Sequence, residues 1–359
     1  MWGDDMRFEW TKKYLQLFCL ISCLFIYFKN AQTIMDAVKD GLLLCYNVII
    51  PSLFIFLIIC SILSETGCCE FMAIPFMPYF RLLNINNKRI VSYCILAILG
   101  GFATGGIMLN KITGEYQCDS NTLGILSILM SGNSPSFVIL AVGVHYLNNL
   151  YLGIILYLSI MISSFITAFF MSFLYKPYSI NATKNHLVVT NNSNNSIRNS
   201  VYSILNICGA VIMSITLCKV FNLYTTNSFI LLIFSAFTEV TTACETVYSN
   251  YGANIYLLLL TLVIFPFSAY LQMKSVGDNN TFNFKILIFS RLIHIPISVL
   301  LLRIALNIFP LASNVYANGD ISINTYWNKP QLSLCLLIIS IMFTAILDKK
   351  SKVFTKRVK

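Results

Sequence analysis

The chain has 359 residues, of which 57% are hydrophobic and only 11% are charged. Because soluble domains carry roughly 25% charged residues, this composition excludes a soluble globular domain and is typical of a polytopic membrane protein. The net charge of +10 does not indicate nucleic-acid binding, because the basic residues from Lys349 to Lys359 form a short tail directly after an apolar run, as in a cytoplasmic membrane anchor.

About ten apolar segments follow one another along the chain, and a plain spanning helix needs about 20 residues. Segment 14–28 is interpreted as an uncleaved anchor, and 29–40 and 68–84 as interfacial segments. The sequence leaves open whether 91–109 and 123–145 span the bilayer or re-enter. The full set of apolar segments is 14–28, 42–63, 91–109, 123–145, 150–174, 200–221, 228–248, 254–273, 284–309 and 331–347.

A polar, Asn-rich linker at 176–199 divides the chain nearly in half. The sequence therefore predicts an anchor and interfacial segment (1–40), a first membrane half (41–175), this linker, a second membrane half (200–347) and a basic tail (348–359). If all ten segments span, the loops on the side of the N-terminus hold 15 of the Lys and Arg residues and the other loops hold 7. This bias predicts that both termini are cytoplasmic.

Each half contains two breaks, where small or polar residues interrupt apolar sequence. In the first half they lie at 99–106 and 131–137, and in the second half at 237–242 and 265–272. Polar, helix-breaking backbone at membrane depth must be buried in protein or line a cavity. Paired breaks in two halves indicate a transporter-type site between inverted repeats. We therefore expect the four breaks to approach one another.

The first-half breaks allow two interpretations. Gly101 and Gly105 have the GxxxG spacing of close helix packing, and Gly106 adds to this small surface. The run Asn133, Ser134, Pro135 favours a binding site instead, because Pro135 removes a helix hydrogen bond and a broken helix offers free N–H groups to anions.

Glu239 is the deepest carboxylate, about eleven residues into an apolar segment. A charge at mid-bilayer costs at least about 2.5 kcal/mol, so Glu239 must face the interior, be protonated, or pair with a cation. It is predicted either to belong to the site or to form a structural pair with Arg291. Arg291 in turn either reaches an anionic substrate or extends towards the surface.

No order of residues in the sequence indicates catalysis. A Ser-His-Asp arrangement, a phosphate-binding loop and a cluster of metal ligands are all missing from the sequence pattern, and the twelve cysteines are scattered, most of them inside apolar runs. We therefore predict that the chain is not an enzyme and needs no cofactor or metal.

Several motifs occur in the order found in one family. They are the run Asn47–Phe56 with Pro51-Ser52-Leu53-Phe54, the glycine motif Gly101–Gly106, the run Ser131–Val138 followed by Val142-Gly143, the motif Phe237–Thr241, Ser268 with Gln272, and Ser290-Arg291-Leu292. In these residues the chain resembles the YlbJ-type sporulation integral membrane proteins, which carry the Gate or nucleoside-recognition repeat. It departs from the family pattern at Ala103, where the family has Pro, and at Ile107, where it has Lys.

The resemblance implies an all-α membrane protein of two inverted Gate-like halves, associated with endospore formation. It further implies transport of a small anion such as dipicolinate across the outer forespore membrane, with membrane lipid as the other partner. The alternative is a non-transporting membrane scaffold needed for spore cortex or coat assembly. The expected substrate-binding residues are Gly101, Gly105, Gly106, Asn133, Ser134, Pro135, Glu239, Thr241, Thr242, Ser268, Gln272 and Arg291.

Overall fold

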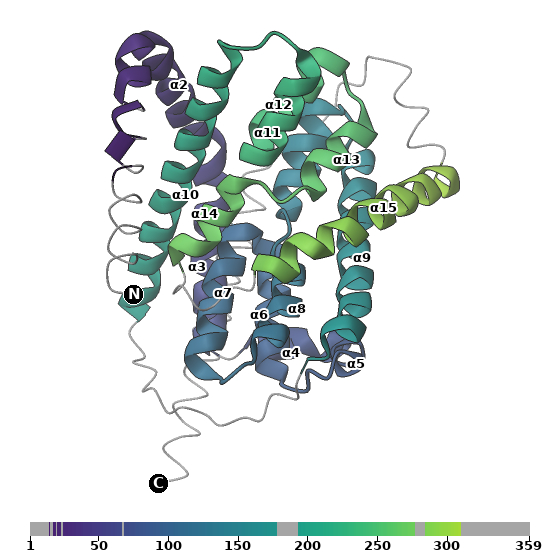
Figure 1. Cartoon of the computed structure of the whole chain (residues 1–359). Helices are drawn as coiled ribbons and strands as arrows, with labels where there is room; N and C mark the ends of the chain where they lie inside the picture. Colours follow the sequence, from purple (N-terminus) through teal and green to yellow (C-terminus); the bar gives the residue numbers. More distant parts are fainter. Residues whose placement is uncertain are drawn as a thin grey trace, which may run out of the picture. The chain divides into compact units, whose positions relative to one another are not determined.

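The computed structural model describes residues 14, 17–18, 20–22, 24–66, 68–177, 193–276 and 284–309. In these residues every regular element is a helix and no strand occurs (Figure 1). The chain divides into two units, Met1–Ala312 and Ser313–Lys359. The predicted segment 331–347 and the basic tail belong to the second unit, which lies outside the described residues.

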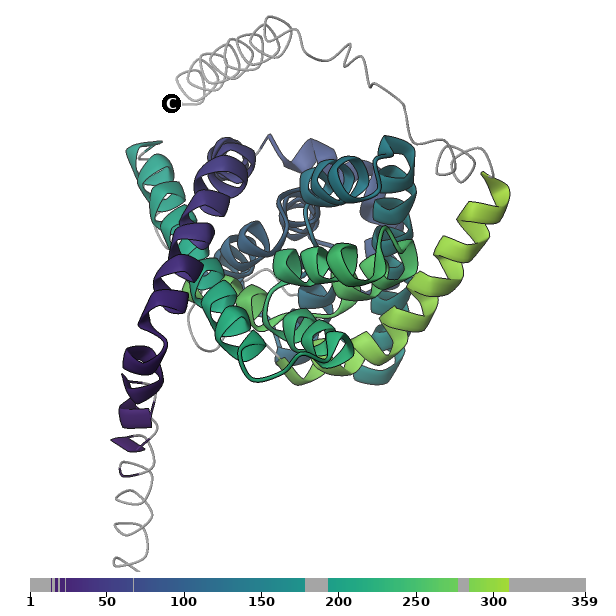
Figure 2. The same ribbon diagram turned by 90° about the horizontal axis from the view of Figure 1, so that it is seen from above.

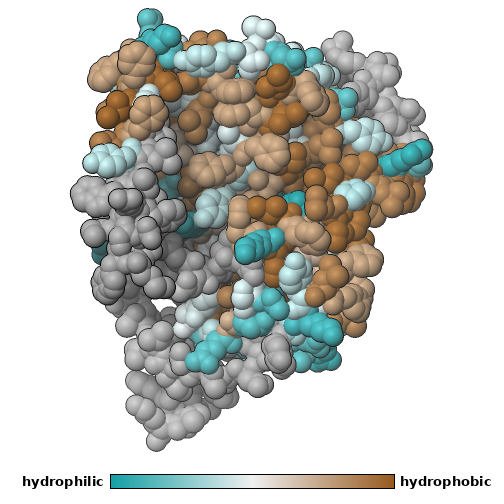
Figure 3. Space-filling view, viewed as in Figure 1, coloured by the Kyte–Doolittle hydropathy of each residue, from teal (hydrophilic) through white to brown (hydrophobic). Residues whose placement is uncertain are grey.

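Four helices are long and apolar enough to cross a membrane. They are Leu150–Tyr175, Ser200–Asn222, Ile255–Lys274 and Phe284–Ile308, the third of which is interrupted at 264–266. Large apolar side chains are exposed on the surface, and Figure 3 shows them spread over the elements labelled α11, α12, α13 and α15 in Figure 1, with polar residues gathered above and below. These features are compatible with an integral membrane protein. The prediction of about ten spans is not confirmed, because only these four helices of the described residues have the length and composition for it.

The first helical run packs antiparallel to the helix that opens the second half. It consists of α2 (Ala31–Leu44), the π-helix η1 (Cys45–Ile49) and α3 (Ile50–Thr66), and it lies along α10 (Ser193–Asn222). Figure 2 shows α2 and α10 side by side. Residues 31–40, predicted to be interfacial, form the first part of α2 in this packed run. Helix α10 likewise begins inside the predicted linker 176–199.

Segment 91–109 lies in a helical hairpin and not in one continuous helix. Its arms are α6 (Lys88–Gly100) and α7 (Phe102–Glu115), which pack against each other along their length. The Arg89 guanidinium lies 2.9 Å from the Glu115 carboxylate at the open end of the hairpin. Because these residues lie near the far ends of the two arms, the arms are antiparallel and Gly101 is the tip.

Segment 123–145 is an interrupted helix. It contains α8 (Ser120–Met130), an interruption at 131–134, and then two helical residues, Pro135 and Ser136, that lead into the π-helix η3 (Phe137–Tyr146). Helix α9 (Leu150–Tyr175) returns antiparallel to it and contacts both parts. The carboxamide of Asn121 donates to the Tyr175 carbonyl at 2.8 Å, which fixes the start of α8 beside the end of α9.

The second half repeats this order of elements. Helices α11 (Ser228–Thr238) and α12 (Val240–Tyr251) pack against each other and meet at Glu239, so the predicted span 228–248 is a second hairpin. Helices α13 (Ile255–Val263) and α14 (Phe267–Val276) follow, separated at 264–266, and α15 (Phe284–Ile308) comes after them. Three short elements, α4 (Glu70–Ala73), η2 (Ile74–Phe76) and α5 (Met77–Leu82), occupy the predicted interfacial segment 68–84.

The two hairpins open towards opposite ends of the bundle. The first opens towards the turn at 116–119, where α8 begins; we call this the α7–α8 end. The second opens towards the turn at 252–254, the α12–α13 end, because the Tyr248 ring near the end of α12 contacts the Tyr146 ring at the end of η3. Their tips therefore point towards each other.

Side-chain caps fix where these helices begin. Asn87, Asn149, Asn227 and Asn254 each accept hydrogen bonds from two N–H groups in the first turn of α6, α9, α11 and α13, and Asp119 does the same for α8. Such a cap stabilises a helix by about 1 kcal/mol. Five polar residues between apolar runs thus set the hairpin and span boundaries.

Candidate functional site

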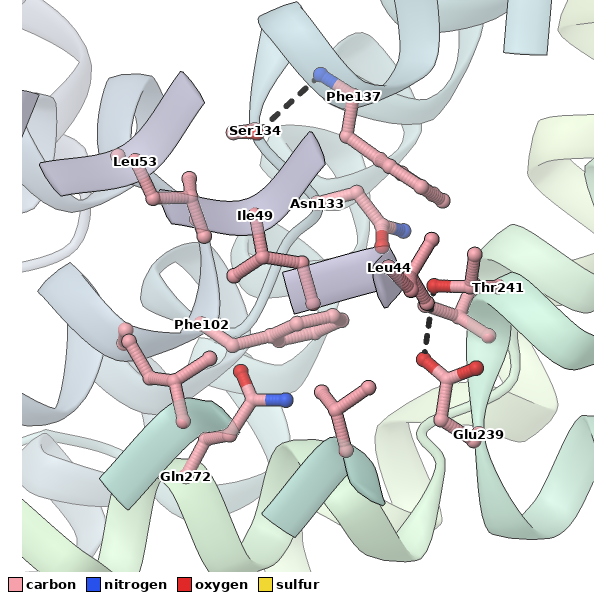
Figure 4. Close-up of a pocket in the computed structure, with 16 residues that line it drawn as sticks. Leu44, Ile49, Leu53, Phe102, Asn133, Ser134, Phe137, Glu239, Thr241 and Gln272 are labelled. Carbon is pink, nitrogen blue, oxygen red and sulfur yellow. Dashed lines mark hydrogen bonds between the residues drawn. The ribbon is translucent and has the colours of Figure 1, made fainter. Parts of the chain in front are cut away.

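The breaks of both halves line one cavity of ≈ 80 Å³. About 10–15 Å³ of such space holds one water, so the cavity has room for several waters or a small solute. Gly101 and Ala103 come from the first hairpin, Asn133 and Ser134 from the first interrupted helix, and Glu239 and Thr241 from the second hairpin. Gln272 comes from α14, and in Figure 4 its carboxamide and the Glu239 carboxylate point into the same space.

Gly101 forms the tip of the first hairpin because its conformation and its packing both require glycine. Its φ is +77°, a region that L side chains rarely adopt. A Cβ on Gly101 would also lie 2.9 Å from the main-chain nitrogen of Ser134. The tip can therefore pack closely on the interruption between α8 and η3.

The interruption at 131–134 exposes main-chain donors. The carboxamide of Asn133 donates to the Leu262 carbonyl at 2.7 Å, and the Ser134 hydroxyl accepts from the N–H of Phe137 at 3.3 Å. Pro135 starts the next helix, where its missing N–H is tolerated. The main-chain N–H groups of Gly132, Asn133 and Ser134 form no hydrogen bond within the described part of the chain.

Glu239 separates α11 from α12 and is only 1% exposed. Its carboxylate accepts from the Thr241 hydroxyl at 2.9 Å, from the Thr242 N–H at 2.7 Å and from the Thr242 hydroxyl at 3.1 Å. The carboxylate thus caps α12, where the helix dipole also favours negative charge. Three neutral donors satisfy it, and no described cation pairs with it.

Gly105 and Gly106 are packing residues in this structure. A Cβ on Gly105 would lie 2.1 Å from the Met130 carbonyl oxygen, and one on Gly106 would lie 2.7 Å from that of Met273. Neither glycine lines the cavity. For these two positions the structure favours the close-packing interpretation of the GxxxG spacing.

Pro135, Thr242 and Ser268 lie beside the cavity without lining it. Thr242 acts through its hydrogen bonds to Glu239. Ser268 is buried in the first turn of α14, one turn before Gln272. Their positions suit a supporting role more than direct contact with a solute.

Arg291 lies in a separate cavity of ≈ 20 Å³, which it lines with Ser131, Gly132, Asn133 and His294. Its guanidinium donates to the Ser131 carbonyl at 3.0 Å and to the Ser131 hydroxyl at 2.7 Å. No ion pair joins Arg291 to Glu239 or to any other carboxylate that the structure describes. The structural pair considered from the sequence is therefore not formed.

Several cavity residues carry no polar signal in the sequence. Leu44, Ile49 and Leu53 from the first helical run, and Phe102 and Phe137 beside the breaks, form the apolar walls. The first run bends through the π-helix η1 here, and π-helical turns often occur at functional sites. Periodicity could not have found these residues, because apolar side chains facing lipid and facing a cavity look alike in sequence.

The described residues hold no group of three or more His, Cys, Asp or Glu side chains that could bind a metal ion. Comparison with protein-family models, with curated proteins and with solved structures finds no match for this chain.

Proposed function

We propose that this chain is a transporter-like integral membrane protein that moves a small anion through the ≈ 80 Å³ cavity. The observation that carries the proposal is the meeting of two oppositely opening hairpins and two interrupted helices around one cavity, in which Asn133, Glu239 and Gln272 stand among apolar walls. Transporter binding sites are typically built from discontinuous helices at a repeat interface. A scaffold protein has no need for a buried carboxylate and two carboxamide side chains beside such a cavity, which favours transport over the scaffold alternative.

We also propose that the two halves are inverted repeats. Some contacts between the halves have a smaller counterpart: α7 packs on α14 as α12 packs on η3, and α8 packs on α15 as α13 packs on α9, while the contact of α10 with α14 has no equivalent of similar extent. The equivalent long helices also pack on each other, α3 on α10 and α9 on α15. Two halves related by a two-fold axis would produce this reciprocity.

For the orientation, we propose that the α7–α8 end is cytoplasmic. Between residues 29 and 309, eight described Lys and Arg residues lie towards this end: Arg81, Lys88, Arg89, Lys111, Lys176, Arg198, Lys274 and Lys285. Four lie towards the α12–α13 end: Lys29, Lys39, Lys219 and Arg303. If all ten segments spanned, Lys111, Lys176 and Arg198 would lie on the side with fewer basic residues. If the two hairpins re-enter, these three residues lie on the side with more basic residues, as the positive-inside rule favours.

For the substrate, we propose a small anion of the dipicolinate class and, from the family resemblance, a location in the outer forespore membrane. The free N–H groups at 132–134 and the buried Arg291 supply donors for anionic oxygen. A charged Glu239 carboxylate would repel such a substrate. We therefore propose that Glu239 binds a proton or a cation when the anion enters.

Uptake into proteoliposomes tests the proposal. The full chain is reconstituted, and entry of radiolabelled dipicolinate is followed against protein-free liposomes of the same lipid. Time-dependent uptake that saturates with substrate concentration is expected. Equal uptake in the two preparations, at confirmed protein incorporation, would reject transport of this substrate class.

A further inference from the structure

Arg291 is a buried cation with no counter-ion among the described residues. Its side chain is 9% exposed, and no described carboxylate lies within ion-pair distance of it. Burying an unpaired charge is expensive, so buried charges are normally paired or bound to an ion. The surroundings of Arg291 therefore lack a negative charge among the described residues.

The groups that do contact Arg291 are all neutral. The Ser131 carbonyl and hydroxyl accept two hydrogen bonds, and His294 Nδ1 lies 2.8 Å from a guanidinium nitrogen. His294 Nε2 lies 3.3 Å from the Ile160 carbonyl oxygen, which can only accept, so Nε2 carries the proton and Nδ1 accepts from Arg291. The Phe265 ring, 5.6 Å from the guanidinium carbon, covers the cation without neutralising it.

Hydrogen-bond donors around Arg291 remain without an acceptor in the described structure. The Nε atom of Arg291 is buried and has no hydrogen-bond partner in the described structure. Gly132 and Asn133 line the same ≈ 20 Å³ cavity, and their main-chain N–H groups form no hydrogen bond within the described residues. A buried donor without a partner, such as Arg291 Nε, calls for a ligand or an ordered water.

We propose that this cavity, bounded by Arg291, Gly132, Asn133 and His294, binds one small anionic group. Its volume is close to that of one water, so it suits a single carboxylate group or a chloride ion and not a whole aromatic acid. Asn133 lines both cavities, which places the anionic group next to the larger cavity that holds Glu239. The bound anionic group could come from two sources, the carboxylate of a transported solute or a free inorganic anion. Only the first source rests on the proposed transport function.

The binding site can be tested on the purified full chain in detergent by its thermal unfolding midpoint, Tm. Wild type is compared in sodium gluconate, in sodium chloride at equal ionic strength, and in gluconate with added dipicolinate. A ligand that binds only the folded state raises Tm. A rise with chloride indicates a free inorganic anion, a rise with dipicolinate alone indicates a carboxylate group, and no rise with either overturns the proposal.

Two substitutions on α15 locate the effect. Arg291→Gln removes the buried cation, whereas Arg303→Gln removes an exposed one from the same helix and serves as the matched control. The rise in Tm is expected to disappear in Arg291→Gln and to persist in Arg303→Gln. If both variants keep the rise, the anion binds elsewhere and the proposal is wrong.

Arg291→Lys covers the case in which Arg291→Gln does not fold. It keeps the charge but loses the planar set of donors, so a smaller rise in Tm than in wild type is expected, and an unchanged rise would contradict the proposed site. The anion site and the transport proposal can fail separately. A rise in Tm with anion but no uptake would support the anion site and reject transport. Uptake without any rise in Tm that depends on Arg291 would support transport and reject the anion site.

Discussion

Glu239 and Arg291 carry opposite charges, and the structure surrounds each of them with neutral partners. Threonine donors hold the carboxylate, while a serine and a histidine hold the guanidinium. Their depth in apolar sequence marked both residues as unusual. It could not tell whether they pair, because that depends on how two distant hairpins and spans pack together.

Cys118 gives a prediction about a single titrating group outside the spans, in the turn at 116–119. Burial, helped by the neighbouring Asp119 carboxylate, raises the pKa of the Cys118 thiol to about 11. Only the thiolate reacts with alkylating reagents, so the alkylation rate should be very low at pH 7. It should increase about tenfold per pH unit until the pH approaches that pKa.

Peptide mapping of iodoacetamide-treated protein by mass spectrometry measures this rate. In Asp119→Asn, which keeps the side-chain shape that caps α8, the pKa of Cys118 should fall and alkylation at pH 8 should be faster. A rate for Cys118 that levels off near pH 9 in wild type would contradict the assigned burial.

At the scale of elements, close approach of helix backbones holds the hairpins in place. Gly105 contacts the Met130 carbonyl at the end of α8, and a methyl group there would overlap it. Gly114 lies on the same helix α7, and a Cβ there would meet no neighbouring atom within 4 Å, which gives the chain its own control.

Gly105→Ala should therefore destabilise the fold by about 1–3 kcal/mol, the usual range for overpacking. Gly114→Ala should be neutral or stabilise by up to about 1 kcal/mol, because alanine favours helix. Thermal unfolding of the two purified variants against wild type checks both. Equal stability of the two variants would show that α7 does not pack on α8 through Gly105.

The sequence predicted the type of these elements better than their paths. Apolar runs located the helices, and Gly101, Asn133 and Glu239 correctly marked interruptions. Hydropathy could not distinguish a re-entrant hairpin from a span, since both are apolar over similar lengths. The distinction depends on long-range contacts such as that between Arg89 and Glu115, which no local pattern encodes.

At the scale of the whole molecule, the proposed re-entry of the two hairpins changes the topology expected from the sequence. If 91–109 were a span, the turns at 116–119 and 84–87 would lie on opposite sides of the membrane. With a hairpin they lie on the same side, and the turn at 223–227 lies on the other. Gln117 and Asn227 are exposed in these turns and provide two reporter positions.

In intact cells, an impermeant maleimide should label Asn227→Cys and leave Gln117→Cys unlabelled, over the background of the unsubstituted chain. Both should be labelled once the cells are opened. Labelling of Gln117→Cys alone from outside would reverse the orientation, and labelling of both positions in sealed cells would contradict the hairpin topology.

The central claim is that the solute passes through the cavity between the hairpin tips. Glu239 is the charged residue that lines this cavity. The most direct measurement is the initial rate of dipicolinate uptake by proteoliposomes containing wild type, Glu239→Gln or Glu245→Gln. Glu245 is an exposed carboxylate on the same helix α12, so it controls for the loss of a charge. We predict that Glu239→Gln lowers the rate at least about tenfold, equivalent to about 1.4 kcal/mol, while Glu245→Gln transports as wild type does. Equal rates for all three proteins at equal incorporation would contradict the account.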